Sequence, residues 1–142
     1  MTNESPQRSK GFLGMWSFRK MFGGSRKVLM ASRLYGKAVR LDQKGKPYEA
    51  IVMVCRVLQA VRTSDAGLTE PDALSQVMTA TSLFDKLATT VGRPEIALTA
   101  LKEAVELCDR AVAADSNLMA VIQPYRDRFY HRIRLIAAQP EP

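Results

Sequence analysis

Two stretches of the chain, GKPYEAI at residues 45–51 and GRPEIAL at residues 92–98, carry a glycine, a base, a proline and a later alanine at matching positions. Glycine is favoured just after a helix ends, and proline is favoured in the first turn of the helix that follows. Each stretch therefore predicts a tight turn between two helices. Because the pattern occurs twice, the sequence predicts an all-α fold built from two helical hairpins.

Apolar residues on both sides of these turns recur at intervals of three and four, as on one face of an α-helix. The spacing predicts a helix over about residues 25–43 and further helices that begin near residues 47, 70, 94 and 118. In the last of these, Pro124 predicts either a kink or a main helix that restarts at the proline. No segment alternates apolar and polar residues as a half-buried strand does, so we expect no sheet.

The second predicted helix, which begins at Pro47, is apolar on several sides. Val52, Met53 and Cys55 lie outside its main apolar face, so we expect this helix to be among the most buried. The two cysteines, Cys55 and Cys108, lie within helical patterns and have no CxxC partner. They are predicted to be buried thiols in a reducing compartment.

The length of 142 residues is enough for one domain with a hydrophobic core and too short for two. We divide the chain into an N-terminal docking segment over residues 1–25, a helical domain over 26–137 and a disordered tail over 138–142. No apolar run is long enough to span a bilayer, and no secretory signal is visible. The sequence predicts a cytoplasmic protein, with a peripheral membrane location or a place in a larger assembly as alternatives.

The formal net charge of +7 is distributed unevenly along the chain. Residues 1–41 contain nine Lys or Arg and one acid, a net charge of +8, whereas residues 42–142 contain twelve bases and thirteen acids, a net charge of −1. Any attraction to phosphate, anionic lipid or an acidic partner is therefore expected near the N-terminus.

Aligned on their glycines, the two hairpins also pair Ile51 with Leu98. This pattern of small and apolar residues resembles the tetratricopeptide repeat, a helix-turn-helix unit of about 34 residues. The resemblance covers roughly residues 30–137 and implies a short helical solenoid of two hairpins, with the last helix as a cap. It also implies that Ala50 and Ala97 lie where the two helices of each hairpin approach closely.

Two features depart from the tetratricopeptide pattern. Ala50 and Ala97 are 47 residues apart, rather than about 34, which predicts a lengthened helix or loop near residues 63–71. Asp85 stands where the family prefers a small residue. About three repeats are usually needed for stability, so we expect the N-terminal segment, a second copy or a permanent partner to supply what two hairpins lack.

The resemblance implies a binding surface, because the first helices of tetratricopeptide hairpins line a concave groove that binds protein segments. Carried over to this chain, the groove residues are Tyr35, Val39, Asp42, Gln43, Ser82, Lys86 and Thr89. Some members of the family grip a terminal carboxylate with lysines and asparagines at set positions. Tyr35 and Val39 stand where that clamp would begin, so we do not expect it here.

The stretch GFLGMWSFRKMFGGSRK at residues 11–27 mixes aromatic and basic side chains. Its candidate partner-binding residues are Phe12, Trp16, Phe18, Arg19, Lys20, Phe22, Arg26 and Lys27. On a helical wheel the apolar residues spread around most of the circumference instead of forming one lipid-facing side. The glycines favour a tail that folds on contact with a partner. We expect the aromatic side chains of this segment to be covered by the protein's own core, by an anionic membrane surface or by another protein.

The chain offers little material for catalysis. Its one histidine, His131, lies on the polar side of the last predicted helix, and the two cysteines lack zinc-ligand spacing. Phosphate-binding, dinucleotide-binding and nucleophile motifs do not occur in the sequence. We therefore expect no enzyme activity, no metal and no cofactor.

Taken together, these features predict a noncatalytic adaptor or scaffold that assembles a protein partner through the groove and the basic aromatic N-terminus. The alternative is a peripheral binder of anionic surfaces, with acidic lipid ahead of nucleic acid. A homodimer and a secretion-type chaperone built on the same repeat also stay open.

Overall fold

The computed structural model describes residues 25–63 and 71–139, which contain five α-helices, two short 3-10 helices and no strand. The α-helices are α2 (Ser25–Gln43), α3 (Pro47–Arg62), α4 (Pro71–Thr90), α5 (Leu98–Ala114) and α6 (Met119–Ala138). The 3-10 helices η3 (Pro94–Ala97) and η4 (Ser116–Leu118) come directly before α5 and α6. The predicted all-α class is confirmed for this part of the chain.

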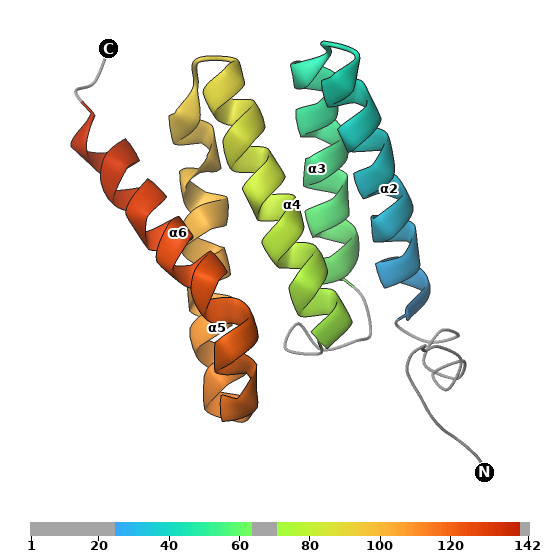
Figure 1. Ribbon diagram of the computed structural model, residues 1–142. Coiled ribbons are helices and arrows are strands. Elements are labelled where there is room, and N and C mark those ends of the chain that lie inside the picture. The colour runs from blue at the N-terminus through green and yellow to red at the C-terminus, as the bar shows by residue number, and fades with distance from the viewer. Residues whose placement is uncertain (1–24, 64–70, 140–142) are drawn as a thin grey trace.

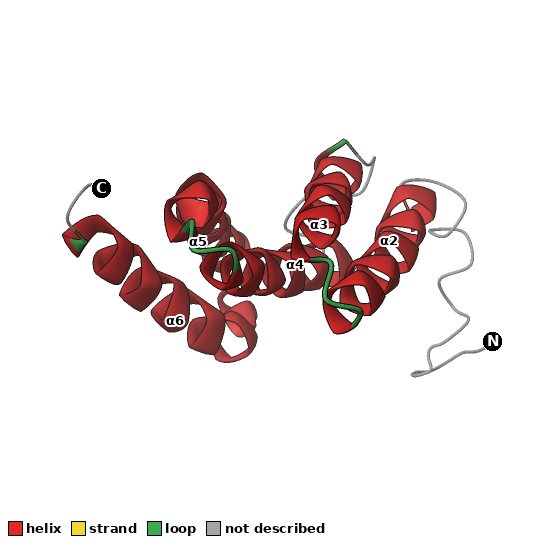
Figure 2. Cartoon of the chain, turned by 90° about the horizontal axis from the view of Figure 1, so that it is seen from above, coloured by secondary structure: helices red, strands yellow, loops and turns green. Residues whose placement is uncertain are grey.

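The helices stand side by side in the order in which they occur in the sequence (Figure 1). Each helix packs mainly on its neighbours in the chain, and α2 also contacts α4. Seen from above, α3 and α5 lie on one side of α4, whereas α2 and α6 lie toward the other side (Figure 2). The array therefore has two distinct sides, and each side carries its own hollow.

The two glycine-containing turns have the same backbone geometry. Gly45 has a φ of 77° and Gly92 a φ of 76°, both in the left-handed region. After α2, the amides of Gly45 and Lys46 donate to the carbonyls of Asp42 (3.0 Å) and Leu41 (2.9 Å), and the same two bonds recur around Gly92. This is the Schellman arrangement, in which a left-handed residue ends a helix. Both predicted turns are confirmed.

The helix starts at the prolines differ in detail from those expected from the sequence. Pro47 begins α3 directly, but Pro94 begins the 3-10 helix η3, so α5 starts only at Leu98. Pro124 lies inside a continuous α6, and the alternative in which the helix restarts at the proline is wrong. The separate first turn is η4, where the Asp115 carboxylate accepts a hydrogen bond from a backbone amide two residues later.

The core is centred on α4, which contributes more buried residues than any other helix. It has this position because α2, α3 and α5 all pack against it. The expectation that α3 is among the most buried helices is wrong, since its buried residues form a single row and Val52 and Cys55 are exposed. Apolar composition on several sides of α3 does not bury it, because its outer side has no neighbouring helix among the described residues.

Small residues occupy the positions of closest packing. Ala38 of α2, Ala50 at the start of α3 and Ala97 just before α5 are all fully buried. Each of them follows or precedes one of the two glycine turns by a few residues, so each hairpin is tight near its turn. At the other end of the array, α6 is held on the core by three buried residues one heptad apart: Ile122, Phe129 and Ile136.

Candidate functional site: a groove lined by α2, α4 and α6

A groove of about 460 Å³ lies on the side of the array formed by α2, α4 and α6. Its lining comprises Tyr35, Val39, Asp42 and Gln43 of α2, Thr79, Ser82, Leu83 and Lys86 of α4, and Tyr125 and Arg128 of α6. Six of the seven groove residues expected from the sequence lie in this lining, and Thr89 is the exception. They meet there because residues three or four positions apart share one side of a helix, and the α2 and α4 rows face the same hollow.

Sequence reasoning missed the contribution of α6. Tyr125 and Arg128 were not among the expected groove residues, yet both line the groove. On the surface of α6, both residues lie next to the row of buried residues that packs on α5. Thr89, which was expected in the groove, is not part of its lining, but its hydroxyl accepts a hydrogen bond from Arg132 at 3.2 Å.

The charges in the groove are only partly balanced. Lys86 Nζ lies 2.7 Å from Asp42 Oδ2, so these two lining residues neutralise each other. The guanidinium of Arg128 lies over the ring of Tyr125, 5.4 Å from its centroid, and makes no ion pair with any described residue. The groove therefore carries one uncompensated positive charge, on Arg128.

Asp85, the residue that departs from the family pattern, joins α4 to α6. Its carboxylate accepts two hydrogen bonds from the guanidinium of Arg132, at 2.7 and 3.1 Å. Both side chains are largely buried, with exposed fractions of 15% for Asp85 and 24% for Arg132. A small residue at this position would leave Arg132 without its acid.

Two hydroxyl groups on α4 have no hydrogen-bond partner in the described part of the chain. They belong to Thr81 and Ser82, whose Oγ atoms are buried. By contrast, the hydroxyl of Thr79 donates to the carbonyl of Ser75 at 3.1 Å, the usual bond of a threonine within a helix. Ser82 lines the groove, so its unpaired hydroxyl lies beneath the surface that a partner would cover.

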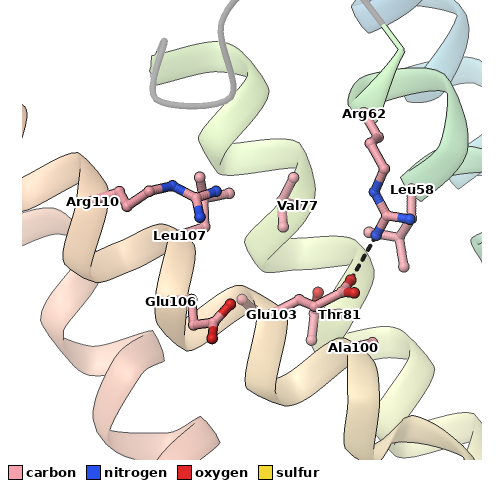
Figure 3. Close-up of a pocket in the computed structure, with 10 residues that line it drawn as sticks. Leu58, Arg62, Val77, Thr81, Ala100, Glu103, Glu106, Leu107 and Arg110 are labelled. Carbon is pink, nitrogen blue, oxygen red and sulfur yellow. Dashed lines mark hydrogen bonds and ion pairs between the residues drawn. The ribbon is translucent and has the colours of Figure 1, made fainter.

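A second, smaller hollow of about 220 Å³ lies on the opposite side of α4, between α3 and α5 (Figure 3). An ion pair between Arg62 and Glu103, 2.7 Å long, spans it, and Glu106 and Arg110 complete a balanced set of two bases and two acids. Thr81 lies in its lining among apolar residues. Because its charges balance, this hollow carries no electrostatic preference of the kind that Arg128 gives the groove.

Most of the N-terminal binding residues expected from the sequence lie outside the described residues. They are Phe12, Trp16, Phe18, Arg19, Lys20 and Phe22. Arg26 falls in the first turn of α2, and Lys27 is exposed. Lys27 Nζ donates to the carbonyl of Thr63 at 3.0 Å, which fixes the start of α2 against the end of α3.

The exposed side of α2 is basic. Arg33, Lys37 and Arg40 are exposed and make no ion pair with another described residue, whereas α2 has a single acid, Asp42, which is held by Lys86. Leu29 and Met30 are exposed close to them, at 48% and 54%. The exposed side of α2 therefore carries excess positive charge next to exposed apolar side chains.

The two cysteines differ, and the expectation of two buried thiols is wrong for one of them. Cys108 is buried, whereas Cys55 is exposed because it lies on the outer side of α3. Burial, together with the negative charge of Asp109, raises the pKa of the Cys108 thiol to about 11. Cys108 Sγ contacts the sulfur of Met78 at 3.5 Å, so it belongs to the core.

In the described ranges, no group of three or more metal-ligating side chains comes together. The same ranges contain no helix with both the length and the hydropathy needed to cross a bilayer. His131 is exposed on α6.

Comparisons of the chain with protein-family models, with curated proteins and with solved structures find no match.

Proposed function

We propose that this chain is a noncatalytic adaptor, a short tetratricopeptide-like solenoid whose groove binds a segment of a protein partner. The observation that supports this most is the groove itself, which collects lining residues from three helices that are far apart in sequence. Its lining combines apolar side chains, such as Val39 and Leu83, with polar and charged ones, as protein interfaces do. The repeat character is supported by the matching geometry of the two glycine turns.

The basic aromatic segment over residues 1–24 is proposed as a second docking element for a partner or an assembly. It precedes α2, whose first turn is anchored to α3 through Lys27 and Thr63. Removal of residues 1–24 therefore leaves that contact in place and tests the segment separately from the groove. If the truncated protein keeps its helical circular dichroism but still recovers every native partner from extract, the docking role of the segment is wrong.

Site-specific photocrosslinking tests the groove. A photoreactive amino acid replaces Gln43, an exposed residue of the groove lining, and the crosslinked products from native extract are identified by mass spectrometry. The matched control carries the same amino acid at Gln59, which is exposed on the outer side of α3. Discrete crosslinks through position 43 and none in common with position 59 are expected; equal products at both positions would contradict the proposal.

A second candidate function, contact with an anionic lipid surface, is supported by the basic side of α2. Arg33, Lys37 and Arg40 follow the exposed Leu29 and Met30 along the same side of α2. Each base near an acidic membrane contributes about 1 kcal/mol of attraction. Such a helix combines apolar insertion with attraction to lipid headgroups. A nucleic acid would meet the same charges, but the described residues offer few exposed rings there on which bases could stack.

Vesicle cosedimentation at two salt concentrations separates these functions. Replacement of Arg33, Lys37 and Arg40 by glutamine should abolish any binding to vesicles that contain phosphatidylserine and leave crosslinking through Gln43 unchanged. Replacement of Arg110 of α5, Arg134 of α6 and Arg93 of the turn before η3, all of which are exposed, serves as a control with the same loss of charge. An unmodified protein that does not bind acidic vesicles at low salt removes the candidate.

A further inference from the structure

If the groove binds a protein segment, as in the proposed function, α6 indicates the chemistry of that segment. One side of α6 carries five residues at intervals of four, three, four and three: Val121, Tyr125, Arg128, Arg132 and Leu135. Residues with this spacing form a single stripe along a helix. Tyr125 and Arg128 line the groove and Arg132 reaches Asp85 of α4, so the stripe faces the same side as the groove.

The two ends of the stripe are apolar and uncovered. Val121 is 65% exposed and Leu135 is 43% exposed. Neither residue is needed to hold α6 in place, because the row of Ile122, Phe129 and Ile136 packs against the core. The stripe therefore presents apolar groups that the described fold does not use.

The centre of the stripe is a positive charge available to a partner. Lys86 is engaged by Asp42 and Arg132 by Asp85, which leaves Arg128 as the guanidinium of the groove without a carboxylate in the described residues. Its position over the Tyr125 ring restrains the guanidinium and leaves its N–H edges free to donate. A carboxylate, the anion that the acidic side chains of a protein partner supply, satisfies two parallel donors of a guanidinium at once.

The distances along α6 define the spacing of the partner. Arg128 lies seven residues after Val121 and seven before Leu135, which corresponds to about 10 Å on each side at the rise of an α-helix. A partner helix that packs along the stripe would present residues with the same heptad interval. We propose that the groove binds an amphipathic helix that carries an acidic residue with an apolar residue one heptad before it and another one heptad after it.

Charge argues against this chain's own N-terminal segment as the occupant. Residues 1–24 contain four bases, namely Arg8, Lys10, Arg19 and Lys20, and one acid, Glu4. A segment with this balance would bring further positive charge toward Arg128. The residue one heptad after Glu4 is Gly11, so this acid lacks an apolar side chain at the required position.

The test uses the full chain and a synthetic, fluorescently labelled helix of about 20 residues. The helix has leucines one heptad before and after a central glutamate on an alanine-rich background with glutamine on the outer side; a second helix has lysine in place of the glutamate. Binding is followed by fluorescence anisotropy. The glutamate helix should bind about fivefold more tightly than the lysine helix, which corresponds to about 1 kcal/mol, the upper end for an exposed ion pair.

Charge exchange makes the contact specific. Arg128→Glu should weaken binding of the glutamate helix and strengthen binding of the lysine helix. Arg134→Glu, the same change at an exposed position on another side of α6, should alter neither affinity. Circular dichroism of both variants verifies that the helices are intact.

Three outcomes would overturn the inference. Equal affinity for both helices, unchanged in the Arg128→Glu protein, removes the acidic preference while leaving the groove as a binding surface. Failure of both helices to bind at low salt removes the helical occupant, and crosslinking through Gln43 still decides separately whether the groove binds a protein. Displacement of the glutamate helix by a peptide of residues 1–24 would assign the groove to the chain's own segment.

Discussion

Arg132 of α6 donates two hydrogen bonds to Asp85 of α4, and together these side chains connect helices that are not consecutive in the chain. The pair is largely buried beside the groove, so it fixes the inclination of α6 and with it the positions of Tyr125 and Arg128. The tetratricopeptide resemblance predicts a small residue at position 85, and the chain has an acid there. The acid is explained by the helix that packs across it.

Removal of either partner of this pair should destabilise the protein. Asp85→Ala or Arg132→Ala leaves a largely buried charge without its counterpart, and a loss of about 1–3 kcal/mol in the free energy of unfolding is expected. The double variant should lose less than the sum of the two single losses. Urea denaturation measures all three. Arg93→Ala, which breaks the exposed pair with Glu95, is the control and should have no measurable effect.

The turns and the first two groove helices could be predicted because their signals are local. Gly45 and Gly92 each stand where a left-handed residue ends a helix, and a proline two residues later starts the next one. Tyr35 and Ser82 were expected in the groove because the tetratricopeptide resemblance assigns the groove to the first helix of each hairpin. Spacing and the repeat resemblance were sufficient for this part of the site.

The contribution of α6 to the groove lining could not be predicted, since it depends on how that helix crosses its neighbours. From the sequence, Tyr125 fits the row that packs on α5 equally well, and the ion pair between Arg132 and Asp85 reveals that this side of α6 faces α4. The exposure of Cys55 has a similar origin. An apolar residue on the outer side of a helix is buried only if another element covers it, and hydropathy alone does not reveal a missing neighbour.

The two turn glycines should be more sensitive to substitution than a glycine inside a helix. At Gly45 and Gly92 a Cβ meets no atom, but an alanine in the left-handed conformation costs about 1 kcal/mol. Gly36 lies within α2 and a Cβ there touches only the end of the Arg40 side chain at 3.5 Å. Gly36→Ala should therefore stabilise the protein by about 0.5–1 kcal/mol. Thermal and urea denaturation of the three alanine variants give the sign of each change in the free energy of unfolding.

The unpaired hydroxyl of Thr81 should be a source of instability. Thr81→Val keeps the shape of the side chain and removes a buried polar group, so a gain of about 1 kcal/mol in the free energy of unfolding is expected. Thr79→Val removes a hydroxyl that does have a partner, the carbonyl of Ser75, and should produce no gain. Equal effects of the two changes in chemical denaturation would show that the unpaired hydroxyl is not the cause.

The two cysteines should react at very different rates. An alkylating reagent at neutral pH should modify Cys55, which is exposed, and leave Cys108 unmodified until the protein unfolds. Because the pKa of Cys108 is raised to about 11, its thiol stays protonated in the folded protein through the pH range in which an ordinary thiol ionises. Peptide mapping after timed alkylation between pH 7 and pH 9 checks this. Simultaneous modification of both residues would contradict the buried position of Cys108.

Packing mainly between neighbouring helices also determines how the protein would respond to mechanical load. When force is applied to the two ends of the chain, α2 and α6 are the outermost elements, and each can separate while the rest of the array stays packed. For α6, the Arg132–Asp85 pair would be among the last contacts to break. An optical trap should therefore record unfolding in several steps of short extension, with α4 in the final one.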